Sequence, residues 1–148
     1  MPNRIAINTL RRAHAALGGS FLAYLAYARP YVGPDDGVLE DAVRSAINEL
    51  EGYSDRLARQ VHRLGGETSP REFPAAYTDA NDVGVRYALR RAANGLREDS
   101  AKLSALADEL LDGDAEAVVT DTAGALGRLA DRLIAVVRAA DPHRGAAT

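Results

Sequence analysis

Hydrophobic residues recur every three or four positions through four stretches of the chain, which is the spacing of the buried face of an amphipathic helix. The clearest stretch begins after Asp35 and Asp36 and ends at Gly65 and Gly66, residue types that are typical of helix ends. Its inward-facing row consists of Val43, Ile47, Leu50, Ser54, Leu57, Val61 and Leu64. The pattern predicts one long helix here.

Three further stretches show the same spacing. They cover residues 10–28, where a proline follows, residues 78–112, starting at a threonine and an aspartate that could cap the helix, and residues 114–140, starting at another aspartate. At 1.5 Å per residue, these stretches correspond to helices about 30–50 Å long. Long helices with short connections predict an all-α four-helix bundle over residues 1–141, with a flexible C-terminal tail at 142–148.

The connection between the second and third predicted helices, GGETSPREFPAAY, is longer than the other two. Its thirteen residues, 65–77, reach at most about 45 Å when fully extended, and Pro70 and Pro74 favour an extended chain. The connection could run the length of the bundle and make the two helices parallel. It could equally form a local loop in an up-down-up-down bundle, and the sequence leaves both arrangements open.

Composition and charge narrow the possible functions. A chain of 148 residues can form a core without disulfides or a metal, and it has no cysteine for a disulfide, a thiolate site or a nucleophile. The net charge is −3 and there is no basic tail, so we expect no nucleic-acid partner. No glycine-rich phosphate loop precedes a helix, and no spacing argues for a serine nucleophile with its histidine and aspartate.

Residues 13–28, AHAALGGSFLAYLAYA, contain no charged side chain. The run is shorter than the roughly 20 residues that cross a bilayer, so we expect no membrane partner. Arginines before it and the small residues at its end are similar to a signal peptide with its cleavage site, although Gly18 and Gly19 weaken the apolar run. We expect a cytoplasmic protein, or an exported one if residues 1–28 are removed. The third explanation is a helix that is buried on two sides.

Two segments resemble the ferritin-like superfamily, as in bacterioferritins. NELEGYSDRLARQVHRLGGETSP is similar to the second helix of these proteins, where a glutamate and a histidine three residues later precede a similar run ending in LGG. AYLAYARPYV is similar to the end of their first helix. The resemblance covers residues 5–70 by pattern and the remainder by helix layout. It implies a bacterial, ferritin-like four-helix bundle with a long crossover between helices two and three.

The iron chemistry of this superfamily requires inward-facing glutamates and Glu-x-x-His pairs. Glu51 stands at one glutamate position, but Ser54 stands at the histidine position. Residues 1–34 contain no acidic residue, and Leu126 and Leu129 occupy the corresponding positions of the last helix. The resemblance therefore implies a degenerate diiron site, and we expect no ferroxidase activity, no bound metal and no cofactor.

Two polar residues interrupt the apolar rows. His14 is either a neutral, hydrogen-bonded core histidine or a ligand contact, and one histidine alone makes a poor metal site. Asp99 should have a partner, because an unpaired buried carboxylate is costly. It is either a border residue that pairs with an arginine such as Arg97, or part of a polar pocket with His14, Glu51 and Ser54. Such a pocket could hold water, a single cation or a small ligand.

Two functions follow from these observations. The first is a non-catalytic helical bundle that acts through homo-oligomerisation or partner binding. Leu22, Leu25 and Tyr27 form a second apolar face on the charge-free stretch, and the resemblance implies a twofold contact between helices one and two, so we expect a homodimer there. The alternative is a small-ligand or single-metal binding protein, or a divergent enzyme, that uses the polar pocket.

Overall fold

The computed structural model describes residues 2–80 and 84–140, and these residues form helices but no strands. The predicted all-α class is confirmed. The described elements are α1 (Pro2–Gly18), α2 (Phe21–Tyr24), α3 (Gly37–Arg63), the 3-10 helix η1 (Ala75–Ala80), α4 (Val85–Ala107) and α5 (Gly113–Ala139). Within the described ranges, no helix combines the length and the apolar composition that crossing a bilayer requires. The predicted tail at 142–148 lies outside the described residues.

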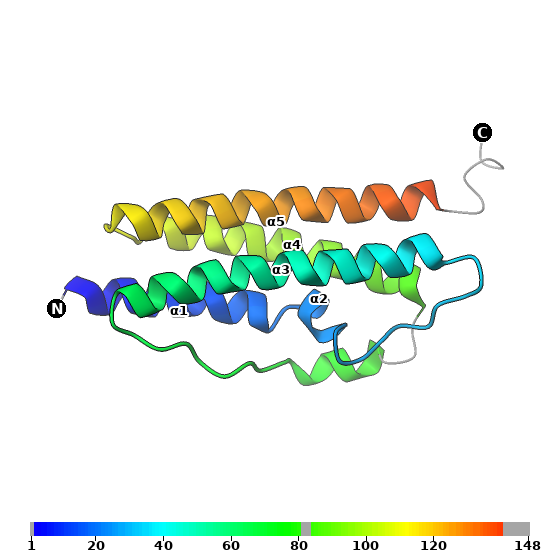
Figure 1. Ribbon diagram of the computed structural model, residues 1–148, viewed down its shortest axis with the longest axis horizontal. Helices are drawn as coiled ribbons and strands as arrows, with labels where there is room; N and C mark the ends of the chain where they lie inside the picture. Colours follow the sequence, from blue (N-terminus) through cyan, green and yellow to red (C-terminus); the bar gives the residue numbers. More distant parts are fainter. Residues whose placement is uncertain (1, 81–83, 141–148) are drawn as a thin grey trace.

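The four long helices α1, α3, α4 and α5 lie side by side along the long axis of the molecule (Figure 1). Asp36, just before α3, forms an ion pair of 3.3 Å with Arg86 near the start of α4, so these two helices begin at the same end. At the opposite end, Arg63 of α3 forms a 2.7 Å ion pair with Asp112, which precedes α5. Helices α3 and α4 therefore run in the same direction, and the connection between them returns along the molecule.

The apolar rows of the helices meet in one core. Its largest fully buried side chains come from all four long helices and from α2, and they are Leu10, Leu17, Leu22, Leu39, Leu57, Val61, Val85, Leu89, Leu96, Leu103, Val119 and Leu126. Burial of apolar surface is the main favourable contribution to folding. The rows predicted from the three-to-four spacing are thus the rows that pack, apart from His14 and Asp99, which are half-buried.

Two helix starts differ from the expectation. Residues 75–80 form η1, and α4 begins only at Val85, so the threonine and aspartate at 78 and 79 do not cap it. The cap of α5 is Asp112, whose carboxylate accepts a hydrogen bond of 2.9 Å from the N–H of Ala115. Asp36 precedes α3 as predicted, but its carboxylate accepts from the N–H of Gly33 at 3.0 Å instead of capping the helix.

The first predicted helix is not continuous. Helix α1 ends at Gly18, and the hydroxyl of Ser20 accepts a hydrogen bond from the N–H of Ala23 at 3.2 Å, which caps the new helix α2. A Cβ atom on Gly19 would lie 2.7 Å from the carbonyl oxygen of Glu72. The absence of a side chain at Gly19 therefore permits a close approach of the main chain of the α3–α4 connection.

The helix break buries part of the predicted dimer surface within the chain itself. Leu22 is 0% exposed and Leu25 is 3% exposed, whereas Tyr27 is 68% exposed. The burial of both leucines is a correction to the expectation that they form an apolar face in need of cover. It removes the reason for placing a second subunit over them.

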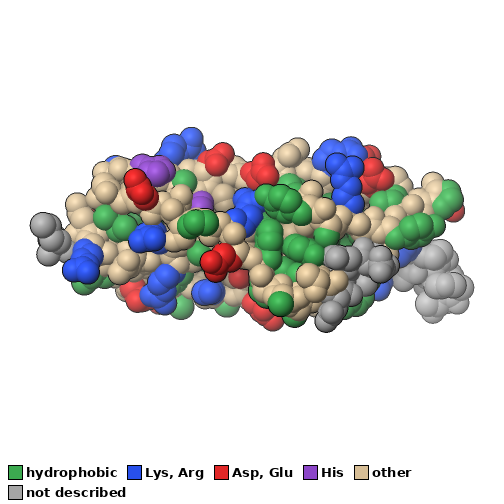
Figure 2. Space-filling view, turned by 90° about the horizontal axis from the view of Figure 1, so that it is seen from below, with side chains coloured by type: hydrophobic (Ala, Val, Ile, Leu, Met, Phe, Trp, Pro, Cys, Tyr) green, Lys and Arg blue, Asp and Glu red, His purple; other side chains and the backbone are tan. Residues whose placement is uncertain are grey.

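Aromatic side chains fasten the α3–α4 connection to the helices. The ring of Phe73 lies 5.3 Å from that of Tyr24, and the ring of Tyr77 lies 5.3 Å from that of Phe21, both in edge-to-face geometry. The guanidinium of Arg91 on α4 lies 4.4 Å from the centre of the Phe21 ring. Figure 2 shows this side of the molecule, with hydrophobic side chains gathered over part of it. Such contacts hold the connection along the helices.

Candidate functional site

The four residues of the predicted polar pocket have different surroundings in the structure. His14 on α1 lies close enough to Asp55 and His62 of α3, and to Arg71 of the α3–α4 connection, for their charges to affect its pKa. Asp99 lies on α4, where its charge acts on Tyr77. Among the described residues, no interaction joins Asp99 to His14, Glu51 or Ser54.

The His14 side chain is half-buried, and its Nδ1 atom has no hydrogen-bond partner among the described residues. Burial lowers the pKa of this imidazole, and the positive charge of Arg71 lowers it further. The neutral form is therefore favoured at pH 7. The predicted neutral histidine agrees with this environment, but the predicted hydrogen bond of a core histidine is missing at Nδ1.

Glu51 and Ser54 border a small cavity that α3 forms with α1, α2 and the α3–α4 connection. Glu51 is exposed and Ser54 is buried, and Arg71 lies across from them. The cavity measures about 10 Å³, which leaves room for at most one water molecule. In the part of the chain that the structure describes, no three His, Asp or Glu side chains are grouped so that they could hold a metal ion. This place is too small for an organic ligand.

Asp99 is half-buried at the border of the core. Its burial raises the pKa of the carboxyl group to about 6, against an opposing effect of Lys102. Arg97, the partner expected from the sequence, instead forms an ion pair of 3.2 Å with Asp131 on α5. Asp99 has no hydrogen bond or ion pair with another described residue, so it is a border residue without the predicted arginine.

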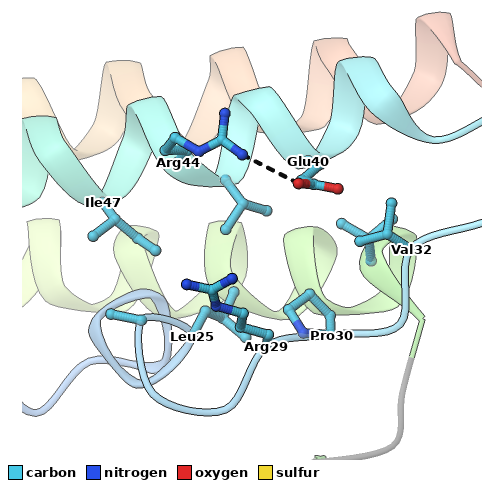
Figure 3. A pocket seen from close by; sticks show the side chains of 10 residues that line it. Leu25, Arg29, Pro30, Val32, Glu40, Arg44 and Ile47 are labelled. Atoms are coloured by element: carbon cyan, nitrogen blue, oxygen red, sulfur yellow. Dashed lines mark hydrogen bonds and ion pairs between the residues drawn. The ribbon is translucent and has the colours of Figure 1, made fainter.

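A larger cavity lies between α3 and the segment 25–32, which follows α2 (Figure 3). Its volume is about 460 Å³, within the range of about 300–1,000 Å³ that is usual for small-molecule sites. Apolar side chains form most of its lining: Leu25, Ala26, Pro30, Val32, Val43, Ile47 and Val85. The charged lining residues are Arg29, Glu40 and Arg44. We refer to this cavity as the α3 cleft.

Segment 25–32 forms the wall of the α3 cleft that faces α3. The start of α4 holds this segment in place. The N–H of Val85 donates a hydrogen bond of 2.9 Å to the carbonyl oxygen of Tyr31, which forms an isolated bridge between the two segments. Pro30 has a fixed φ angle and restricts the backbone of the preceding Arg29 to extended conformations. The sequence Arg-Pro-Tyr therefore sets the direction of the main chain at the rim of the cleft.

The two walls of the cleft differ in charge. On α3, Arg44 donates to Glu40 at 3.1 Å and to Asp41 at 3.2 Å, so its positive charge is compensated. On the other wall, Arg29 points toward the cleft (Figure 3). Arg29 is exposed and forms no hydrogen bond or ion pair with any residue that the structure describes. Among the charged residues of the lining, Arg29 is thus the one without a partner in the part of the chain that the structure describes.

The spacing of residues along the chain does not reveal this cleft. The spacing places Val43 and Ile47 in the core and Leu25 at a dimer contact, and it indicates no role for Arg29. The path of segment 25–32 depends on the break at Gly19 and on the bond to Val85, and neither contact is visible as a pattern. The one local signal is an arginine that is followed by a proline directly after an apolar stretch.

Comparisons with protein-family models, with curated proteins and with solved structures gave no match for this chain. The relation to ferritin-like proteins therefore stays a prediction from the quoted sequence segments.

Proposed function

We propose that this protein is a non-catalytic, ferritin-like four-helix bundle that binds a small, largely apolar molecule in the α3 cleft. The observation that carries the proposal is the cleft itself, with its volume of about 460 Å³ and its mostly apolar lining. Small-molecule sites combine such a lining with a few placed polar groups. In the α3 cleft, the polar groups are the three charged side chains.

The arrangement of the long helices supports the bundle part of the proposal. Helices α1, α3, α4 and α5 lie side by side, and α3 and α4 are parallel with a long connection between them (Figure 1). This is the layout that the ferritin-like resemblance implies, with one long crossover.

The lining of the cleft favours binding over chemistry. Catalysis by side chains needs a nucleophile or a proton donor held within hydrogen-bond reach of a base. Here Glu40 is paired with Arg44 at 3.1 Å, and the remaining lining is apolar except for Arg29. We therefore place the ligand site in the α3 cleft and not in the polar pocket of Glu51 and Ser54.

A neutral fluorescent probe tests whether the cleft binds apolar molecules. N-phenyl-1-naphthylamine, which becomes fluorescent in apolar sites, is titrated into the wild type and into an Ala26→Trp variant. Ala26 is exposed and borders the cleft, so the added indole should fill part of the cavity. We expect the affinity for the probe to fall at least about tenfold, or about 1.4 kcal/mol.

The matched control is Ala117→Trp, which adds the same side chain at an exposed position near the start of α5. The chain has no tryptophan of its own, so the two variants differ only in where the indole stands. The control should bind the probe as the wild type does. Absence of probe binding, or equal binding by all three proteins, would contradict the proposed site.

A further inference from the structure

Arg29 has a charge that no described residue neutralises. Its neighbour Pro30 and the bond between Tyr31 and Val85 restrain the main chain that carries it. The side chain lies at the rim of the α3 cleft and points toward it (Figure 3). A guanidinium presents parallel N–H donors that match the two oxygens of a carboxylate. An anionic group at the rim would find its partner here.

The two carboxylates of the opposite wall, Glu40 and Asp41, both accept hydrogen bonds from Arg44. Glu40 would repel an anion if its carboxylate were free, but Arg44 donates to it at 3.1 Å. A cationic ligand would have to displace Arg44 from Glu40 and would also face Arg29. The unpartnered Arg29 therefore favours a negative charge at the rim over a positive one.

The floor of the cleft specifies the rest of the ligand. Leu25, Val43 and Val85 are buried at its base, and Val32 and Ile47 are half-buried along its sides. These side chains contain no hydrogen-bonding groups, so this part of the cleft favours a hydrocarbon. Charge at the rim and apolar surface below match a molecule with a charged head and a hydrocarbon tail.

We infer that the ligand of the α3 cleft is a monoanionic amphiphile, a carboxylate on a short hydrocarbon chain, whose head group pairs with Arg29. This inference rests on the proposed binding function of the cleft. Because the rim is open to solvent, the ion pair contributes modestly, and we expect the negative charge to improve affinity about three- to tenfold.

The test compares two ligands that differ in the head group alone. Decanoate and 1-decanol, each below its aggregation limit, displace N-phenyl-1-naphthylamine from the wild type, from Arg29→Gln and from Arg59→Gln. Arg59 is an exposed arginine of α3 outside the cleft lining, so its substitution changes the net charge of the protein equally. Unfolding curves of the three proteins establish that each is folded.

We expect decanoate to bind more tightly than decanol to the wild type and to Arg59→Gln, and the two ligands to bind equally to Arg29→Gln. High salt should reduce the advantage of decanoate in the wild type. Equal binding of the two ligands to the wild type, or an advantage that persists in Arg29→Gln, overturns the inference while the cleft still binds the neutral probe. If the probe does not bind in the cleft, the proposed function fails and the inference fails with it.

Discussion

Polar residues within the apolar rows differ in how their hydrogen bonds are satisfied. The hydroxyl of Thr122, which is fully buried, donates to the carbonyl oxygen of Val118 at 2.7 Å, one turn earlier in the same helix. Asp99 has no such bond to a described residue, and neither does Nδ1 of His14. A charged group without a partner loses solvation on folding and gains little in return. Asp99 should therefore reduce stability when it is ionised.

This effect gives a prediction for the dependence of stability on pH. Burial raises the pKa of Asp99 from 3.8 to about 6, so the folded protein binds the proton more tightly than the unfolded chain. Stability should then fall as the pH rises from about 4 to about 6, and it should stay low above that range. Asp99→Asn should raise the free energy of unfolding at pH 7.5 by about 1–2 kcal/mol, since solvent access reduces the upper bound of about 3 kcal/mol.

Urea denaturation at pH 4 and at pH 7.5 measures the difference. The variant and the wild type should be nearly equally stable at pH 4. Asp35→Asn is the control, because Asp35 is exposed and has no partner among the described residues. If the stability of the wild type and that of Asp99→Asn depended on pH in the same way, the Asp99 carboxyl group would not be the cause of the pH dependence.

Among the elements, the break between α1 and α2 has the largest consequence for the site. The main chain turns at Gly19 and Ser20, which brings Leu22 and Leu25 into the core and sends segment 25–32 along α3. A continuous helix through this stretch would leave no separate wall for the cleft. The α3–α4 connection stabilises the break, since Glu72 lies directly against Gly19.

Two glycine substitutions distinguish this close approach from ordinary helix propensity. Gly19→Ala should lower the free energy of unfolding by about 1–3 kcal/mol, because the new methyl group would collide with the Glu72 carbonyl at 2.7 Å. Gly52→Ala should raise it by about 0.5–1 kcal/mol, because Gly52 lies inside α3 with open space around it. Urea denaturation measures both. Stabilisation by Gly19→Ala would mean that the connection does not contact α1 in this way.

For the whole molecule, the crossover decides which helix ends meet. Arg86 near the start of α4 reaches both Asp36 before α3 and the carbonyl oxygen of Ala140 after α5, at 3.3 Å and 2.7 Å. Contacts between the ends of three helices thus stabilise the end of the molecule that contains the cleft. The same packing covers Leu22 and Leu25 without a second chain.

Leu22→Ala tests whether that leucine serves the core or a dimer. Removing a fully buried leucine side chain should cost about 2–4 kcal/mol, and the unfolding midpoint should not depend on protein concentration. Tyr27→Ala, at the exposed predicted interface residue, should change stability by less than about 0.5 kcal/mol. Light scattering and denaturation at two concentrations check both variants. If the protein were a dimer and either substitution dissociated it, the expected twofold contact would be supported after all.

Much of the helical layout could be predicted, because its signals are local. The row from Val43 to Leu64 follows from the three-to-four spacing, and Gly65, with a φ of 90°, ends the helix as its residue type suggests. The start of α4 could not be predicted, since residue types that cap a helix, at 78 and 79, occur here within η1. The α3 cleft could not be predicted, because residues that share a face of their own helices do not show which other segments they meet.

The sequence by itself determined the helical class, the four apolar rows and the absence of the iron ligands that the resemblance requires, since each follows from residue type and spacing. Only the tertiary structure decided the parallel course of α3 and α4, the break at Gly19 and the position of Arg29 at the rim of a cleft. These three features depend on contacts between residues that are far apart in the sequence, such as Glu72 with Gly19 and Val85 with Tyr31. Periodicity reports which face of a helix is buried, but it does not report what lies against it.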